Sequence, residues 1–158
     1  MAELFLALEQ SGLGAAMRES SFLYPLANVL HILGLGAFAG AIAIMDARLL
    51  GAFAQMPLVA FVRRWRKVAM AAFVVQVVSG FLLLSAEASA IVENPVFRLK
   101  VLLIMVGLVN VAVFELVTKP RLAGSHDAQP GLAAKVSGTV SLLVWFAVAA
   151  AGRLIAYF

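Results

Sequence analysis

The sequence contains no cysteine and few charged side chains. Without cysteine the chain cannot form a disulfide, a thiolate metal site or an iron–sulfur cluster. Charged residues make up 13% of the 158 positions, whereas about 25% is usual in soluble domains. This shortage of charge argues against a soluble enzyme, a nucleic-acid-binding protein and a disordered regulator.

Histidine is also scarce, and this limits any site built on imidazole. The two histidines are His31, within an apolar stretch, and His126, within the polar sequence Ser-His-Asp. Side chains adjacent in sequence seldom form a catalytic triad, so we interpret the His126 segment as a solvated loop. A metal or haem site inside a membrane would therefore have His31 as its histidine.

Apolar residues are abundant, at 64% of the chain, and the mean hydropathy is +1.04. A water-facing domain of this size could not bury so much apolar surface, so the sequence predicts an integral membrane protein in contact with a lipid bilayer. The net charge of +4 and the pI near 10.0 are then interpreted as a signal of topology, and no nucleic-acid partner is expected.

Four apolar runs approach the roughly 20 residues that cross a bilayer as a helix. They predict an all-α protein with an antiparallel four-helix transmembrane bundle over residues 21–158. A short amphipathic stretch over residues 1–20 predicts an interfacial helix, and the missing basic leader argues against a cleaved signal peptide. We expect the spans at about residues 22–45, 68–85, 100–117 and 135–156.

Lysine and arginine are distributed unequally between the two sides of the predicted bundle. In membrane proteins, cytoplasmic loops carry the excess of lysine and arginine. In this sequence these residues concentrate after the first and third spans, and fewer lie on the opposite side. We therefore expect a multi-pass protein of the bacterial inner (plasma) membrane with both termini on the periplasmic, external side. The richer side holds Arg48, Arg63, Arg64, Arg66, Lys67, Lys119, Arg121 and Lys135.

Polar side chains inside the first span form a stripe. Tyr24, Asn28 and His31 follow one another at steps of four and three residues, so they share one helix face. Polar groups in a span face the bundle interior when they find a partner there, and we expect this stripe to line a pocket open to the outside. The alternative is that His31 only hydrogen-bonds a neighbouring helix.

Several cations are predicted at the same depth as this stripe. Antiparallel spans bring Arg98, Lys100 and Arg153 to the outer end of the bundle. An imidazole beneath a basic rim suits an anionic ligand such as haem b or another porphyrin, with His31 as metal ligand. Alternatively, the cations only extend to lipid headgroups. The aromatic residues available to pack the macrocycle are Phe38, Phe81, Phe97 and Phe146.

Deeper polar residues are expected to hold helices together. Gln76 and Asn110 are placed to hydrogen-bond across helices, and Asn110 is also a candidate ligand-binding residue. The G-x-x-x-G step at Gly36 and Gly40 permits close helix approach, which favours packing within the chain over formation of a homo-oligomer.

Charged residues near the inner end of the bundle are expected to form ion pairs that fix helix ends. Asp46 is paired in this interpretation with Arg48, and Glu115 with Lys119 and Arg121.

A set of short motifs resembles a bacterial family of small four-span membrane proteins of unknown function. The resemblance extends over about residues 20–158. Its motifs are Tyr24-Pro25 followed by Asn28, His31 and Gly34, then Asp46-Ala-Arg48-Leu-Leu-Gly51, Asn94-Pro95-Val-Phe97-Arg-Leu-Lys100, Asn110, and Ala151-Gly-Arg153-Leu-Ile-Ala-Tyr157.

More distantly, a histidine in the first span and a lysine opening the third resemble HemJ-like protoporphyrinogen oxidases and the copper-resistance protein D group. The resemblance implies a role for haem b, with His31 and Lys100 as the catalytic positions. We therefore expect a porphyrin-binding redox protein. The alternatives are a small-solute, metal or proton transporter and a structural membrane subunit.

Overall fold

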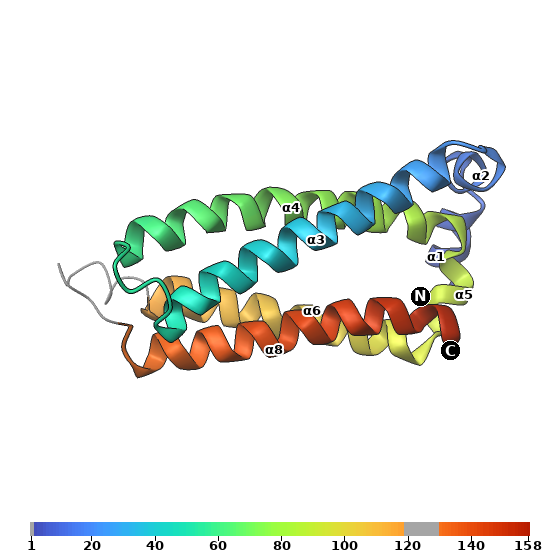
Figure 1. Cartoon of the computed structure of the whole chain (residues 1–158). Coiled ribbons are helices and arrows are strands. Elements are labelled where there is room, and N and C mark those ends of the chain that lie inside the picture. Colours follow the sequence, from blue (N-terminus) through green and yellow to red (C-terminus); the bar gives the residue numbers. More distant parts are fainter. Residues whose placement is uncertain (1, 119–129) are drawn as a thin grey trace.

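The computed structural model describes residues 2–118 and 130–158, and in these ranges the chain is helical with no strand. Figure 1 shows that the chain reverses direction between successive long helices. The predicted all-α antiparallel bundle is confirmed. The long helices are α3 (Leu23–Leu50), α4 (Leu58–Ala86), α6 (Pro95–Val113) and α8 (Leu132–Leu154).

Short helices complete the fold at the ends of the long ones. The π-helical turn η1 (Phe114–Thr118) continues α6, so the two form one stretch over Pro95–Thr118. This stretch, α3, α4, and α8 with its 3-10 extension η2 (Ile155–Tyr157) are each long and apolar enough to span a membrane. The chain is therefore a multi-pass membrane protein. The remaining short elements are α1 (Ala2–Glu9), α2 (Gly12–Glu19) and α5 (Ala88–Glu93).

The helices extend beyond the predicted spans because charged residues remain helical at the membrane edge. Helix α4 begins at Leu58, so the basic run expected to precede the second span lies within its first turns. Helix α3 continues to Leu50 and ends at Gly51, whose φ of 113° is a left-handed conformation that glycine adopts without strain. Asn94 begins α6 by accepting hydrogen bonds from the next two free backbone N–H groups.

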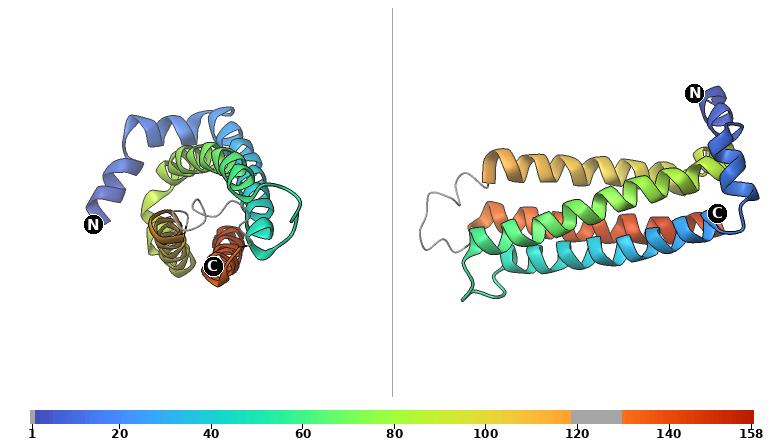
Figure 2. Two further views of the ribbon diagram at one scale, coloured as in Figure 1. Left: turned by 90° about the vertical axis from the view of Figure 1, so that its left-hand side faces the viewer. Right: turned by 90° about the horizontal axis from the view of Figure 1, so that it is seen from above.

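The N-terminal segment forms two helices where the sequence predicted one. The Ser11 side chain accepts a hydrogen bond from the Gly14 N–H and caps α2. Figure 2 shows both helices lying across the end of the bundle that holds the C-terminus. A Cβ atom at Gly14 would lie 2.7 Å from the Ser85 carbonyl oxygen, so glycine permits the close contact between α2 and α4.

The four long helices do not contact one another equally. Helix α3 packs along both α4 and α8, and α6 packs along α8, whereas the backbones of α4 and α6 stay farther apart along most of their length. Apolar side chains cover the outside of all four helices, and most residues of each span face outward. This outward apolar surface is what contact with lipid requires.

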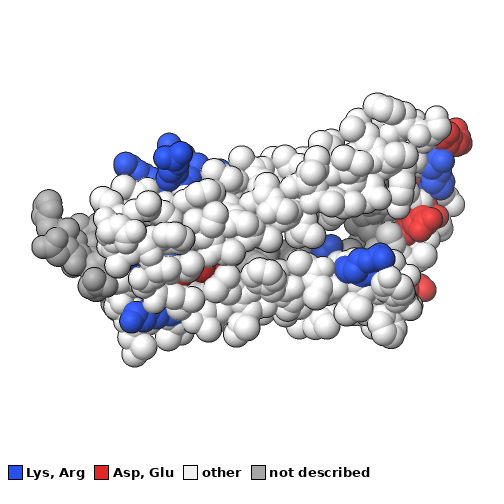
Figure 3. Space-filling model, viewed as in Figure 1, with Lys and Arg blue, Asp and Glu red and all other residues white. Residues whose placement is uncertain are grey.

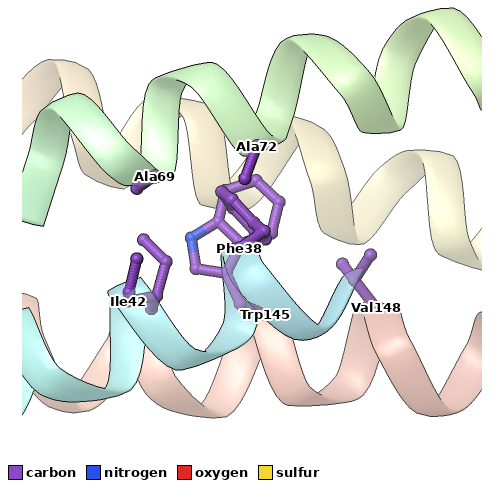
Figure 4. Close-up of a cluster of buried hydrophobic side chains, with 7 residues drawn as sticks. Phe38, Ile42, Ala69, Ala72, Trp145 and Val148 are labelled. Atoms are coloured by element: carbon purple, nitrogen blue, oxygen red, sulfur yellow. The ribbon is translucent and has the colours of Figure 1, made fainter. Parts of the chain in front are cut away.

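Three aromatic rings fill the centre of the bundle. The Phe38 ring lies 4.8 Å from Trp145 in an edge-to-face arrangement and 5.5 Å from Phe73, measured between ring centroids. Figure 4 shows Phe38 and Trp145 with their smaller neighbours Ile42, Ala69 and Val148. We call Phe38, Phe73 and Trp145 the aromatic layer. It joins α3, α4 and α8.

Glycine has a different role in this packing from the one predicted. A Cβ atom at Gly36 or Gly40 would meet nothing within 4 Å, and both residues are exposed. The prediction that this G-x-x-x-G step packs within the chain is therefore wrong, because its face points away from the other helices. The close approach occurs at Gly107, where a Cβ atom would lie 2.8 Å from Cζ2 of Trp145.

We expect Gly107→Ala to destabilise the bundle, because the added methyl group would displace the Trp145 ring from the aromatic layer. Such overpacking costs about 1–3 kcal/mol. Thermal unfolding in detergent, followed by tryptophan fluorescence, measures the loss. Gly36→Ala is the matched control, and an equal loss of stability in both variants would contradict this explanation.

Two hydrogen bonds to the Glu9 carboxylate join α1 to α5. The Ser89 hydroxyl and backbone N–H donate to Oε2 of Glu9 at 2.5 Å and 2.9 Å. These hydrogen bonds, from the side chain first and then the backbone, hold the pKa of Glu9 below its usual 4.5. A lowered pKa in the folded state stabilises the contact above the ordinary pKa, and this stabilisation is lost as the pH falls through the lowered value.

We therefore expect the Glu9 carboxyl group to titrate at higher pH in Ser89→Ala than in the unmodified protein. Carbon-13 carboxyl shifts measure the two titrations, with Glu9→Gln assigning the signal. Unchanged titration in Ser89→Ala would show that the contact does not hold the carboxylate.

Candidate functional site

A cavity of about 310 Å³ lies on the side of the aromatic layer nearer the chain termini, and all four long helices line it. We call it the outer cavity. Figure 3 shows the molecule hollowed between α3 and α8 near this end, with lysine or arginine atoms at the edge of the hollow. The polar side chains that line the outer cavity are His31, Gln76 and Lys100.

A chain of hydrogen bonds fixes the tautomer of His31. The Ser79 hydroxyl donates to the Val75 carbonyl at 2.6 Å, which uses its one proton. The Ser79 oxygen lies 2.9 Å from Nδ1 of His31 and must therefore accept, so Nδ1 carries the imidazole proton. This leaves a lone pair on Nε2, which has no hydrogen bond among the described residues. Nε2 is thus free to ligate a metal ion or to accept a proton.

Two further features of α4 hold His31 against the helix. The Gln76 side-chain amide donates to the His31 carbonyl oxygen. A Cβ atom at Gly80 would lie 3.1 Å from Cε1 of the imidazole, so glycine makes room for the ring. Gln76 and Asn110 each form the predicted hydrogen bond across helices, but not with each other: Gln76 bonds α3, and Asn110 bonds Ser137 of α8.

Lys100 contributes an unpaired cation to the same cavity. Its Nζ would lie 3.3 Å from a Cβ atom at Gly152, so this glycine gives the ammonium group space beside α8. Lys100 makes no hydrogen bond or ion pair with any residue of 2–118 or 130–158. A charge inside a membrane bundle is costly unless an opposite charge or water compensates it, and an anion in the outer cavity would do so.

The other predicted outer residues do not line this cavity. Tyr24 and Asn28 are exposed. Arg98 donates through Nε to the Val92 carbonyl, which turns it toward α5. Arg153 donates to the Tyr157 hydroxyl at 2.7 Å and lies over its ring. The structure thus brings His31 and Lys100 to one cavity, and it places Arg98 and Arg153 at the surface. His126 lies outside the described residues.

A second cavity, of about 330 Å³, lies on the opposite side of the aromatic layer. We call it the inner cavity. Asn110 belongs here, paired with Ser137 through two hydrogen bonds of 3.1 Å. The charged residues that line it are Asp46, Arg66 and Glu115.

Asp46 is the cavity residue that the sequence analysis misinterpreted. Arg48 does not pair with it, because the Arg48 guanidinium donates instead to the carbonyls of Ala54 and Met56. Glu115 pairs with Arg66 of α4, while its predicted partners Lys119 and Arg121 lie outside the described residues. The spacing in the sequence could have indicated that Asp46 faces the interior, because Asp46 follows Phe38 by two helical turns on the same inward face.

The comparisons with known proteins identify a family but no activity. The family described as "Family of unknown function (DUF6644)" matches residues 5–158, so the chain belongs to this family. No curated protein and no solved structure matches the chain. The motif resemblance is thus confirmed at the level of a family of unknown function, and these comparisons do not support similarity to HemJ-like oxidases or the copper-resistance protein D group.

We expect nitrogen-15 spectra of a His126→Ala variant, in which His31 is the one histidine left, to show a proton on Nδ1 and none on Nε2 at neutral pH. Gly80→Ala and Ser79→Ala should each disturb this tautomer, because one displaces the ring and the other removes its acceptor. Gly40→Ala is the control, since it adds a methyl group to open space. A proton on Nε2 in the parent variant would contradict the hydrogen-bond chain.

Proposed function

We propose that the outer cavity binds haem b or a related metalloporphyrin and that the protein has a redox role in the membrane. The observation that supports this proposal is that His31 and Lys100 lie together in one largely apolar cavity. His31 presents an unprotonated Nε2, and Lys100 presents an ammonium group without a partner among the described residues. An apolar anionic ligand that also carries a metal ion complements the apolar wall, the Lys100 ammonium group and the Nε2 lone pair.

The residues around the two polar groups fit such a ligand. Ser79 holds the Nδ1–H of His31, and this outer hydrogen bond keeps Nε2 oriented for metal ligation. Lys100 would bind a propionate carboxylate by a charge-assisted hydrogen bond. Of the aromatic residues expected to pack the macrocycle, Phe38, Phe81 and Phe97 line the cavity, whereas Phe146 does not. Bound haem would supply one-electron chemistry at its iron.

The cavity wall includes residues that also face lipid. Val77 of α4 and Val101 of α6 line the cavity and are exposed on the outside of the bundle, where the backbones of α4 and α6 lie apart. This arrangement supports entry of an apolar ligand from the bilayer between these two helices. We further propose, from the distribution of lysine and arginine, that the cavity lies on the periplasmic side of a bacterial inner membrane.

We expect protein purified in mild detergent from haem-replete cells to show a Soret band that His31→Ala abolishes. His126→Ala is the matched control, because it removes the other histidine, and it should keep the band. Oxidised and dithionite-reduced visible spectra, with haem quantified per chain, are the measurement. A colourless, folded protein from the same cells would overturn the proposal.

We expect the two polar groups to be separable by titrating ligand-free protein with haemin and with metal-free protoporphyrin. Lys100→Met should weaken both ligands by about 10- to 100-fold, the value of a hydrogen bond to a charged group. His31→Ala should weaken haemin alone, because metal-free porphyrin has no iron to ligate. Lys135→Met, at an exposed position, is the control. Equal binding by all variants would exclude this site.

Transport is a second candidate function, supported by the two cavities that share the aromatic layer as a common wall. Phe38, Phe73 and Trp145 line both cavities, an arrangement that a gate between two half-channels would have. The polar residues His31 and Gln76 lie on one side of this layer and Asn110 on the other. Uptake into proteoliposomes that changes in Phe38→Ala, without any chromophore, would favour transport over the redox proposal.

A further inference from the structure

The inner cavity contains two buried polar groups without partners. Oδ2 of Asp46 and Nε1 of Trp145 make no hydrogen bond within the described ranges. Both residues line the cavity, and they are 1% and 5% exposed. The large majority of buried side-chain polar atoms have a hydrogen-bond partner, so an acceptor and a donor unpaired in the same cavity require an explanation.

The neighbouring charged residues do not compensate Asp46. Arg66 is paired with Glu115, which lies in the π-helical turn η1. Arg48 donates to carbonyls of the loop that follows α3, and its buried Nη1 has no partner among the described residues, but it forms no ion pair with Asp46 there. No other basic residue of the described part of the chain lines the cavity. The Ser141 hydroxyl is the side-chain hydrogen-bonding group beside Asp46, and it carries no charge. Among the described residues, an ionised Asp46 therefore forms no ion pair.

Most of the remaining cavity wall is apolar, and its other polar side chains include the Arg66–Glu115 ion pair and the hydrogen-bonded Asn110 and Ser137. Phe38, Phe73 and the ring of Trp145 close one end, and aliphatic and methionine side chains form most of the remainder. Figure 4 shows the indole nitrogen of Trp145 directed toward the Ile42 and Ala69 end of the cluster, and Ile42 lies one helical turn before Asp46. A water molecule held between Asp46 and Trp145 would satisfy hydrogen bonds but would supply no positive charge to the carboxylate.

The inner cavity also has an apolar opening. Met70 and Val74 of α4 line it and are each 59% exposed, and Val111 of α6 is exposed as well. These residues lie along the two helices whose backbones stay apart. A molecule dissolved in the bilayer would reach Asp46 by this path without crossing the aromatic layer.

We infer that the inner cavity is a binding site for a small amphipathic organic ammonium, whose charged head pairs with Asp46 and whose apolar body packs against the aromatic layer. The ammonium group supplies both the positive charge and the hydrogen-bond donor that Oδ2 lacks. The faces of Trp145 and the two phenylalanines attract a cation held near them. The Trp145 N–H remains available to an oxygen acceptor on the same ligand. This site lies across the aromatic layer from the outer cavity, and the inference does not depend on the function proposed for that cavity.

The test uses Trp145 itself as the reporter, with n-hexylammonium as the probe. A Trp65→Phe background leaves Trp145 as the one tryptophan, and the protein is placed in nanodiscs of zwitterionic lipid. The expected result is a saturable change in fluorescence, with binding about 30-fold weaker or more in Asp46→Asn, as for the loss of a buried charge partner. Glu87→Gln, an exposed acid at the other end of α4, is the matched control and should bind as the background does.

Comparison with n-hexanol separates charge from apolar packing in the protein that retains Asp46. Hexanol should bind this protein more weakly than hexylammonium does. It should bind the Asp46→Asn variant as tightly as the protein that retains Asp46. Equal binding of the two probes, equal binding to both proteins, or no saturable change would each overturn the inference. His31→Ala should leave hexylammonium binding unchanged, so failure of the porphyrin proposal and failure of this one are distinguishable.

Discussion

The aromatic layer formed by Phe38, Phe73 and Trp145 is the contact on which the rest of the bundle depends. Lipid is as apolar as leucine, so helices in a bilayer associate through close packing and hydrogen bonds and not through release of water. The three rings provide that packing at the centre, where α4 and α6 leave space between their backbones. Gly107 completes the layer, because the absence of its side chain lets the Trp145 ring lie against α6.

Hydrogen bonds to backbone carbonyls connect this packing to the chemistry of His31. Gln76 donates to the carbonyl of His31, and Ser79 donates to that of Val75 while accepting from the imidazole. Within a bilayer these donors have no water as an alternative partner, so the pairing between α3 and α4 and the tautomer of His31 are fixed together. The same bonds that join the helices thus leave Nε2 unprotonated toward the outer cavity.

Hydropathy and periodicity were sufficient to predict the four-helix bundle, because each span must be long, apolar and helical to satisfy its own backbone. His31 and Lys100 were also predicted to lie at one depth, since antiparallel helices fix depth. Rotation about each helix axis was not predictable. It turns Arg153 and Gly36 to the outside and Asp46 to the interior. Packing at residues such as Gly80 and Gly107 decides this rotation, and no local sequence pattern reveals their contacts.

The two cavities carry opposite charge requirements, and this explains why one bundle holds both. Lys100 lies in the outer cavity and Asp46 in the inner one, each without a partner of opposite charge among the described residues. The aromatic layer lies between the two cavities, so the two charges are on opposite sides of it. A bundle selected only for stability would replace both residues with apolar ones, because an uncompensated charge in a membrane costs free energy. The two proposed ligands, of opposite charge to each other, would compensate Lys100 and Asp46 separately, each from its own side of the aromatic layer.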